Sequence, residues 1–133
     1  MNQLVVRREG GDRYRLQVRG HQVLVDQPLD DGGEDTAPTP TELFVAGIAS
    51  CVAFYAGRFL RRHGISEEGL AVECDFAFAA DRPARVGEVS LRVLLPPGFP
   101  EERRTALRSV VEHCTVHNTL RQPPAVEIAL ETP

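Results

Sequence analysis

The cysteines are the residues of this sequence best suited to chemistry. Cys51 lies within a long apolar segment, and Cys114 ends an apolar stripe that recurs at helical spacing from Leu107. Two cysteines on separate helices that share one interface are what a reversible dithiol–disulfide centre requires. The simpler alternative is that both are core residues, because unpaired cysteine is among the most buried residue types. Cys74 alternates in step with apolar residues of a predicted strand, so we assign it a structural role.

His117 is the other candidate near these thiols. It follows Cys114 by three residues, a spacing from which it could stabilise a thiolate or bind zinc with Cys114 and a third group. One cysteine and one histidine make only half of a tetrahedral zinc site, so we predict no metal and no cofactor. A histidine at a helix end also interacts favourably with free carbonyls, which explains His117 without chemistry.

The first helix has a clear start. Thr39-Pro40-Thr41-Glu42 places threonine at the N-cap, proline at the first helical position and glutamate at the third, which is a capping box. The segment that follows is apolar on every side, so the helix must be enclosed by protein all round. A monomer of this size leaves one face of such a helix in water, and a homodimer is the simplest remedy.

Alternating apolar and polar residues predict strands before and after this helix. The fold class is therefore α+β, in the order βββ-α-ββ-α-β, within a single domain over residues 1–133. We expect three strands within about 1–27, an acidic loop over 28–38, the buried helix over about 40–63, two strands over about 70–95, a second helix over about 100–117 and a last strand over about 125–131.

The composition argues against several classes of partner. The sequence has 15 basic and 19 acidic residues, a net charge of -4, which disfavours nucleic acid and anionic membranes. All the basic residues are arginine, so lysine Schiff-base chemistry is excluded. The longest apolar run, residues 43–56, is shorter than the roughly 20 residues that span a bilayer, and residues 1–8 lack the apolar core of a signal peptide. We expect a soluble, cytoplasmic protein.

Two motifs make the sequence similar to a known family. One runs from Asp26-Gln27-Pro28 through Gly32-Gly33-Glu34-Asp35 and Pro38 to Ala49-Ser50-Cys51, and the other is His113-Cys114-Thr115-Val116-His117-Asn118-Thr119-Leu120. Together they resemble the OsmC/Ohr family. The resemblance implies an intertwined homodimer in which two swapped sheets wrap the central helices. It also implies that Cys51 attacks a hydroperoxide and that Cys114 resolves the sulfenic acid as a disulfide, which a dithiol such as dihydrolipoamide or a lipoylated protein reduces.

The sequence departs from the family pattern in the groups that would activate the thiolate. Peroxidase members carry a glutamate ten residues before the reactive cysteine, where this sequence has Thr41. The adjacent Glu42 points about 100° away around the helix, and the capping box explains it without catalysis. A buried thiolate needs a nearby cation. We assign that role to Arg19, with Arg15 as the alternative.

Two functions of different classes fit these features. The first is a thiol-dependent peroxidase that reduces organic hydroperoxides or hydrogen peroxide through a Cys51 sulfenic acid resolved by Cys114. The second is a non-catalytic or weakly active OsmC-like dimer that binds a small apolar or electrophilic ligand in the same pocket, for which Phe44, Ile48, Phe54 and Tyr55 are the candidate lining. A Cys–His hydrolase would need a base and an oxyanion hole that the sequence does not offer.

Overall fold

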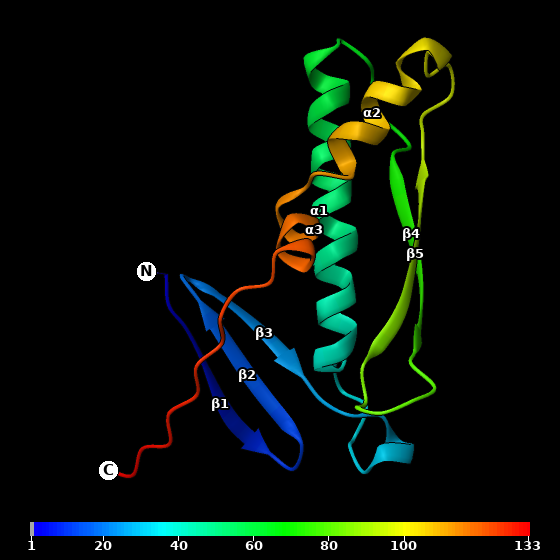
Figure 1. The fold of residues 1–133 in the computed structure, drawn as a ribbon. Coiled ribbons are helices and arrows are strands. Elements are labelled where there is room, and N and C mark those ends of the chain that lie inside the picture. The colour runs from blue at the N-terminus through cyan, green and yellow to red at the C-terminus, as the bar shows by residue number, and fades with distance from the viewer. Residues whose placement is uncertain (1) are drawn as a thin grey trace.

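The computed structural model describes residues 2–133 and has a mixed α+β architecture (Figure 1). Two small antiparallel sheets lie on opposite sides of one long helix, and two shorter helices pack beside that helix. The predicted α+β class is therefore confirmed. The elements are β1 (Leu4–Gly10), β2 (Arg13–Val18), β3 (His21–Val25), α1 (Pro40–Arg62), β4 (Ala71–Phe78), β5 (Val86–Leu94), α2 (Arg104–Val111) and α3 (Thr115–Arg121), with short 3-10 turns at Leu29–Asp31 and Glu101–Arg103.

Both sheets pair strands that are neighbours in sequence: β1, β2 and β3 form a meander, and β4 and β5 form an antiparallel pair. In the first, Leu16 of β2 lies between Val6 of β1 and Val23 of β3. The turn from β1 to β2 requires Gly11, whose φ of 55° lies in the left-handed region that glycine adopts without strain. In the second sheet Cys74 of β4 pairs with Leu91 of β5.

The capping box predicted for α1 is present. The Oγ1 of Thr39 accepts a hydrogen bond from the backbone N–H of Glu42 at 3.0 Å, and the Oε1 of Glu42 accepts one from the N–H of Thr39 at 2.8 Å. These two bonds satisfy two of the donors that a helix start leaves free. The helix ends at Arg62, where Gly64 turns the chain with a φ of 67°.

The buried core gathers around the C-terminal half of α1. Ala56, Phe59 and Leu60 pack against Leu107 of α2, and residues of β5 such as Val93 close over them. Burial of these side chains fixes α1 against α2 and the β4–β5 sheet. Burial along α1 is uneven: Val45 and Ile48 are buried, whereas Phe44 and Phe54 remain about half exposed.

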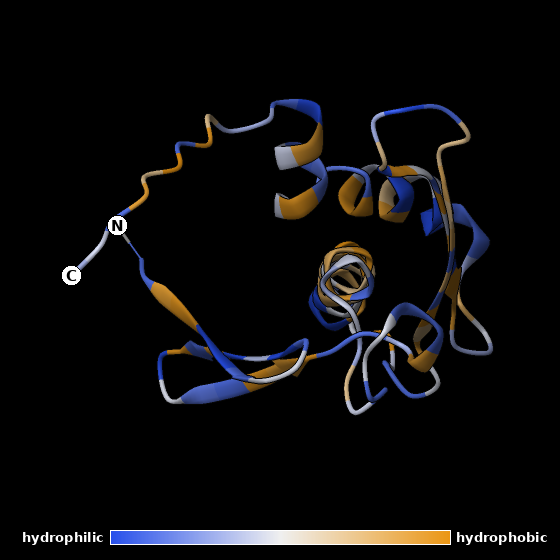
Figure 2. Cartoon of the chain, turned by 90° about the horizontal axis from the view of Figure 1, so that it is seen from below, coloured by the Kyte–Doolittle hydropathy of each residue, from blue (hydrophilic) through white to orange (hydrophobic). Residues whose placement is uncertain are grey.

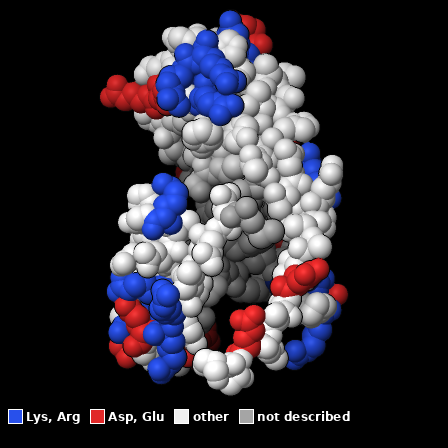
Figure 3. Space-filling view, turned by 90° about the vertical axis from the view of Figure 1, so that its left-hand side faces the viewer, with Lys and Arg blue, Asp and Glu red and all other residues white. Residues whose placement is uncertain are grey.

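The sheet β1–β3 projects away from α1, as Figure 2 shows. Figure 3, seen from the side on which β1–β3 lies in Figure 1, shows a hollow between two charged ends, with few charged residues visible along its rim. Helix α1 is long and apolar enough to cross a membrane by length and composition, a test that the core helix of a soluble protein also passes. Here it packs against β4, β5, α2 and α3.

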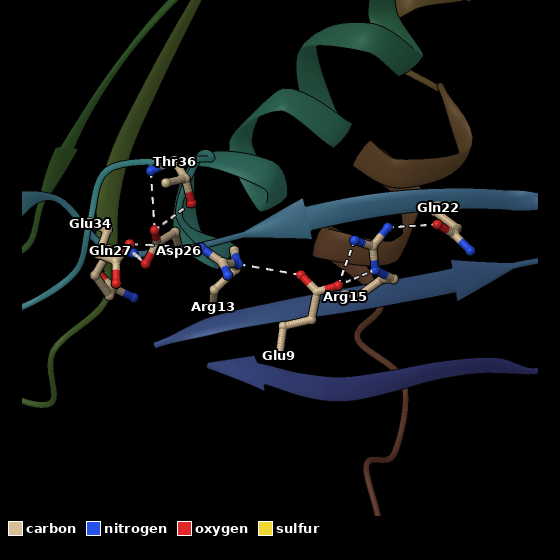
Figure 4. Close-up of polar contacts among 8 residues, drawn as sticks. All are labelled: Glu9, Arg13, Arg15, Gln22, Asp26, Gln27, Glu34 and Thr36. Atoms are coloured by element: carbon tan, nitrogen blue, oxygen red, sulfur yellow. Dashed lines mark hydrogen bonds and ion pairs between the residues drawn. The ribbon is translucent and has the colours of Figure 1, made fainter. Parts of the chain in front are cut away.

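A buried carboxylate organises the loop that leads into α1 (Figure 4). Asp26, which is 2% exposed, accepts hydrogen bonds from the hydroxyl and the N–H of Thr36 at 2.6 and 3.1 Å. Its own N–H donates to the carbonyl of Pro38 at 3.1 Å. A Cβ at Gly33 would lie 2.0 Å from the carbonyl oxygen of Gln27, so only glycine fits there. The loop over residues 26–38 is thus closed on itself and held at the start of α1.

The predicted second helix over 100–117 is wrong in its extent. The chain instead forms a 3-10 turn, then α2, and then a separate α3. The break falls at Cys114, which is in an extended conformation with φ -66° and ψ 156°. Its sulfur accepts a hydrogen bond from the N–H of His117 and so caps the next helix, a role usually filled by oxygen-bearing side chains.

The last strand predicted over 125–131 is not formed in the structure. The alternation that predicted it is real, but Val126, Ile128 and Leu130 are 78%, 84% and 96% exposed. A strand requires an edge with which to pair, and this segment leaves α3 without meeting one in its own chain (Figure 1).

Candidate dithiol site

Helices α1 and α3 bring Cys51 and Cys114 together. Cys51 lies in the middle of α1, and Cys114 is the residue directly before α3. The neighbouring Cys51 side chain raises the pKa of the Cys114 thiol, so the two side chains lie near each other. Both cysteines are reduced in this structure. The juxtaposition that a dithiol–disulfide centre requires is therefore present within one chain.

The two thiols have different surroundings. Cys114 is fully buried, whereas Cys51 is partly exposed. Burial raises the pKa of the Cys114 thiol, and the neighbouring Cys51 raises it further against the opposing effect of the His117 N–H. Cys114 is thus held as a neutral thiol out of reach of solvent, while Cys51 is the member of the pair that a reagent can approach.

A hydrogen bond next to the cysteine pair was missed in the sequence. The hydroxyls of Tyr55 on α1 and Thr115 on α3 lie 2.8 Å apart. Tyr55 follows Cys51 by one helical turn, and Thr115 follows Cys114 directly. The only sequence signal was that a tyrosine among apolar residues needs a partner for its hydroxyl.

Glu42 and the two candidate arginines are engaged elsewhere. Glu42 belongs to the capping box and lies at the start of α1. Arg19 is in the turn between β2 and β3 with a φ of 53°, at the end of the sheet that points away from α1 (Figure 1). Arg15 donates to Glu9 and to Gln22 across the same sheet (Figure 4). The structure does not bring these groups to the cysteine pair of their own chain.

His117 lies in the first turn of α3, so the expectation that it meets the free carbonyls at a helix end is wrong. The backbone of His117 donates to Cys114 at 3.4 Å. Within residues 2–133 no three His, Cys, Asp or Glu side chains are grouped closely enough to hold a metal. Cys74 lies in the β4–β5 sheet, where burial and then the charge of Asp75 raise the pKa of its thiol.

A cavity of about 410 Å³ lies between α1, α2 and β5. Its walls are mainly apolar, and three lining arginines each pair with a carboxylate: Arg92 with Asp75 and Arg104 with Glu101, both at 2.7 Å, and Arg108 with Glu112 at 3.6 Å. The expected lining of Phe44, Ile48, Phe54 and Tyr55 is wrong for this cavity. The residues that line it include Val52, Leu91, Val93, Leu107, Val111 and His117. Cys51 and Cys114 are not among its lining residues, although Val52 follows Cys51 directly in sequence.

The sequence matches the family described as OsmC-like protein over residues 32–129. This match covers both cysteines and most of the chain. The chain belongs to the OsmC-like family. The resemblance seen in the two sequence motifs is therefore confirmed, and no curated protein matches the sequence.

Solved OsmC-like structures share this fold. One is a protein of Psychrobacter arcticus 273-4 described as an osmotic stress induced and detoxification response protein. It is 25% identical to this chain with a TM-score of 0.81, and the match covers 90% of this chain and 88% of that one. The organic hydroperoxide resistance protein OsmC of Legionella pneumophila is 22% identical with a TM-score of 0.68, over 91% and 89%. OhrB of Bacillus subtilis, an organic hydroperoxide resistance protein, is 20% identical with a TM-score of 0.64, over 92% of each chain.

Proposed function

We propose that this OsmC-like protein is a thiol-dependent peroxidase that reduces organic hydroperoxides. The observation that carries the proposal is the pair of reduced, adjacent thiols of unequal exposure, Cys51 and Cys114. A peroxidatic cysteine must meet its substrate, whereas a resolving cysteine needs only to meet its partner. The names of the Legionella and Bacillus relatives as organic hydroperoxide resistance proteins support the same substrate class.

The chemistry proceeds in two balanced steps. The Cys51 thiolate attacks the distal oxygen of the hydroperoxide, an S–O bond forms, the O–O bond breaks, and the alkoxide leaves and takes up a proton. The sulfur of Cys114 then attacks the sulfenic acid, the S–S bond forms, and the hydroxyl leaves as water with the Cys114 proton. The neutral Cys114 thiol of the resting protein suits this order, because it does not compete for the peroxide.

A dithiol must return the disulfide to the reduced state. We propose dihydrolipoamide or a lipoylated protein for this step, with the oxidised lipoyl ring as the product. Such a reductant fits a reducing compartment, where structural disulfides are rare and catalytic ones turn over, and we place the protein in the cytoplasm.

We further propose that the working form is a homodimer. The apolar side chains of the C-terminal segment, Val126, Ile128 and Leu130, are exposed in the single chain, as are Leu4 and Val6 of β1. A second copy would supply the strand edge that the C-terminal segment lacks and would cover the hollowed face of Figure 3. In such a dimer, the second copy would supply the groups that activate Cys51, Arg19 among them.

Titration of the reduced protein with cumene hydroperoxide tests the peroxidase. One equivalent should remove two thiols and lower the intact mass by about 2 Da, from the loss of two hydrogens. Cys51→Ser should abolish turnover with dihydrolipoamide, and Cys74→Ser is the matched control that should retain it. Unchanged thiols at excess peroxide would contradict the proposal.

That same negative result would favour the second function, a non-catalytic or weakly active binding module. The observation in its favour is that Thr41 replaces the glutamate of peroxidase members while Arg15 is already paired with Glu9. The cavity between α1, α2 and β5 would then hold a small apolar or electrophilic ligand.

A further inference from the structure

Helix α3, which begins directly after the buried Cys114, makes few contacts of its own with the rest of the chain. None of the residues of α3 is buried. Within residues 2–133 the hydrogen bond between the hydroxyls of Tyr55 and Thr115 is the only one that joins α3 to α1. Burial of Cys114 fixes the residue before α3, and the Tyr55–Thr115 contact is the polar link that holds the first turn of α3 itself to α1.

The Tyr55 side of this contact is held in place. The guanidinium of Arg58 lies 5.5 Å from the ring centroids of both Phe54 and Tyr55. The rings of Phe54 and Tyr55 also meet edge to face at 5.7 Å. Both contacts restrict the Tyr55 ring, so its hydroxyl presents a fixed anchor to α3.

The Thr115 side is joined rigidly to Cys114. The backbone N–H of Asn118 donates to the carbonyl of Cys114 at 2.9 Å, and its side-chain amide donates to the carbonyl of His113 at 3.1 Å. Thr119 adds a bond from its hydroxyl to the carbonyl of Thr115 at 2.9 Å. Cys114 and Thr115 consequently move as one unit, and whatever fixes the Thr115 hydroxyl also fixes the Cys114 sulfur.

We infer that the Tyr55–Thr115 hydrogen bond positions Cys114 for disulfide formation with Cys51. Tyr55 and Thr115 are positioning residues, since they act through the resolving thiol and touch no reacting atom. The contact spans the same two helices as the thiols, one helical turn from Cys51 on α1 and one residue from Cys114. It raises the effective concentration of the Cys114 thiol at Cys51 by limiting the freedom of α3.

If the protein is the peroxidase proposed above, this positioning of Cys114 decides the fate of the oxidised Cys51. After the first oxidation, the Cys51 sulfenic acid either condenses with Cys114 and releases water, or reacts with a second hydroperoxide to give sulfinic acid and the alcohol. The first product is reducible by a dithiol, whereas the second is not. Faster encounter with Cys114 therefore protects Cys51 from over-oxidation.

The test is a thiol–disulfide equilibrium that needs no peroxide. The reduced protein is incubated with mixtures of oxidised and reduced dithiothreitol, and the disulfide fraction is read by mass after alkylation. Tyr55→Phe and Thr115→Val should each lower the equilibrium constant about twofold to tenfold, the range of one neutral hydrogen bond. Thr115→Ser keeps the hydroxyl and should restore the wild-type value. Tyr14→Phe removes the other tyrosine hydroxyl of the chain, on β2, and is the matched control.

A second readout follows the products of oxidation. At excess cumene hydroperoxide, Tyr55→Phe and Thr115→Val should raise the ratio of sulfinic acid to disulfide by a similar factor, while Thr115→Ser and Tyr14→Phe should not. Equilibrium constants that are unchanged or raised in both hydroxyl-free variants would overturn the inference. A disulfide that forms with oxidised dithiothreitol but not with peroxide would instead overturn the peroxidase and leave the positioning role standing.

Discussion

Asp26 and Thr36 are ten residues apart in sequence, and their side chains close the loop that delivers the chain to α1. Thr36 donates to the Oδ2 of Asp26 through its hydroxyl at 2.6 Å and through its N–H at 3.1 Å. The Thr36 hydroxyl, with the N–H groups of Gln27 and Thr36, lowers the pKa of Asp26 to about 2. A carboxylate that is ionised and hydrogen-bonded in this way stabilises the fold only while it stays ionised.

The stability of the protein should therefore fall in acid through Asp26. Because folding lowers the pKa of Asp26 from 3.8 to about 2, its contribution is present above pH 4 and is lost as the pH falls through 2. Asp26→Asn should be less stable than wild type at pH 7, and the two free energies of unfolding in urea should converge between pH 4 and 2. Asp30→Asn, an exposed change in the same loop, is the control. Parallel pH profiles for Asp26→Asn and wild type would refute this role.

The capping box assigns Glu42 to the stability of α1 and not to catalysis. Thr39→Ala removes the acceptor for the Glu42 N–H and should lower the free energy of unfolding by about 1 kcal/mol. Glu42→Gln keeps an acceptor for the Thr39 N–H and should leave both stability and the rate of peroxide consumption close to wild type. A large loss of peroxidase rate in Glu42→Gln at unchanged stability would show that Glu42 acts in the reaction.

Local signals in the sequence were sufficient for α1 and the strands before it. Thr39, Pro40 and Glu42 mark the helix start by chemistry that acts within one turn, and Gly11 marks a turn in the same way. The nearness of Cys51 to Cys114 was expected from the burial of both, Cys51 in an all-round apolar segment and Cys114 at the end of an apolar stripe, although the helix expected to carry Cys114 breaks at that residue. These features depend on neighbours along the chain or on the burial of one face.

Leu60 lies at the centre of the core that fixes α1. It is fully buried against Phe59 and Leu107. Leu60→Ala should lower the free energy of unfolding by about 2–5 kcal/mol, through lost burial and the cavity left behind. Leu29→Ala, at a residue that is 71% exposed, should change it by less than about 0.5 kcal/mol. Urea denaturation of both variants measures the difference, and equal effects would contradict this placement of the core.

The C-terminal segment should hold the proposed dimer together through one face only. Ile128→Asp puts a charge among Val126 and Leu130, and it should convert the dimer to monomer at micromolar concentration. Ala129→Asp puts the same charge on the opposite face of the same segment and should leave the dimer intact. Light scattering after size exclusion gives the mass of each form. A wild-type protein that is monomeric at these concentrations would contradict the proposal.

The features that the sequence did not predict depend on contacts between residues that are distant in sequence, or on contacts with another chain. The break between α2 and α3 arises because a cysteine sulfur serves as a cap, which residue preferences do not anticipate. The segment around Ile128 has the pattern of a strand, but pattern alone does not supply an edge to pair with. The contact of Tyr55 with Thr115 joins residues 60 positions apart and required the fold itself.

The central claim is that Cys51 and Cys114 join and separate in one reaction cycle. The most direct measurement is peptide mapping of the wild-type protein after one equivalent of cumene hydroperoxide, without reduction, and again after dihydrolipoamide. We predict a single linked pair of peptides that contains Cys51 and Cys114, with Cys74 still a free thiol, and complete loss of that link after the dithiol is added. Recovery of Cys51 and Cys114 as free thiols after peroxide, or a link that involves Cys74, would contradict the account.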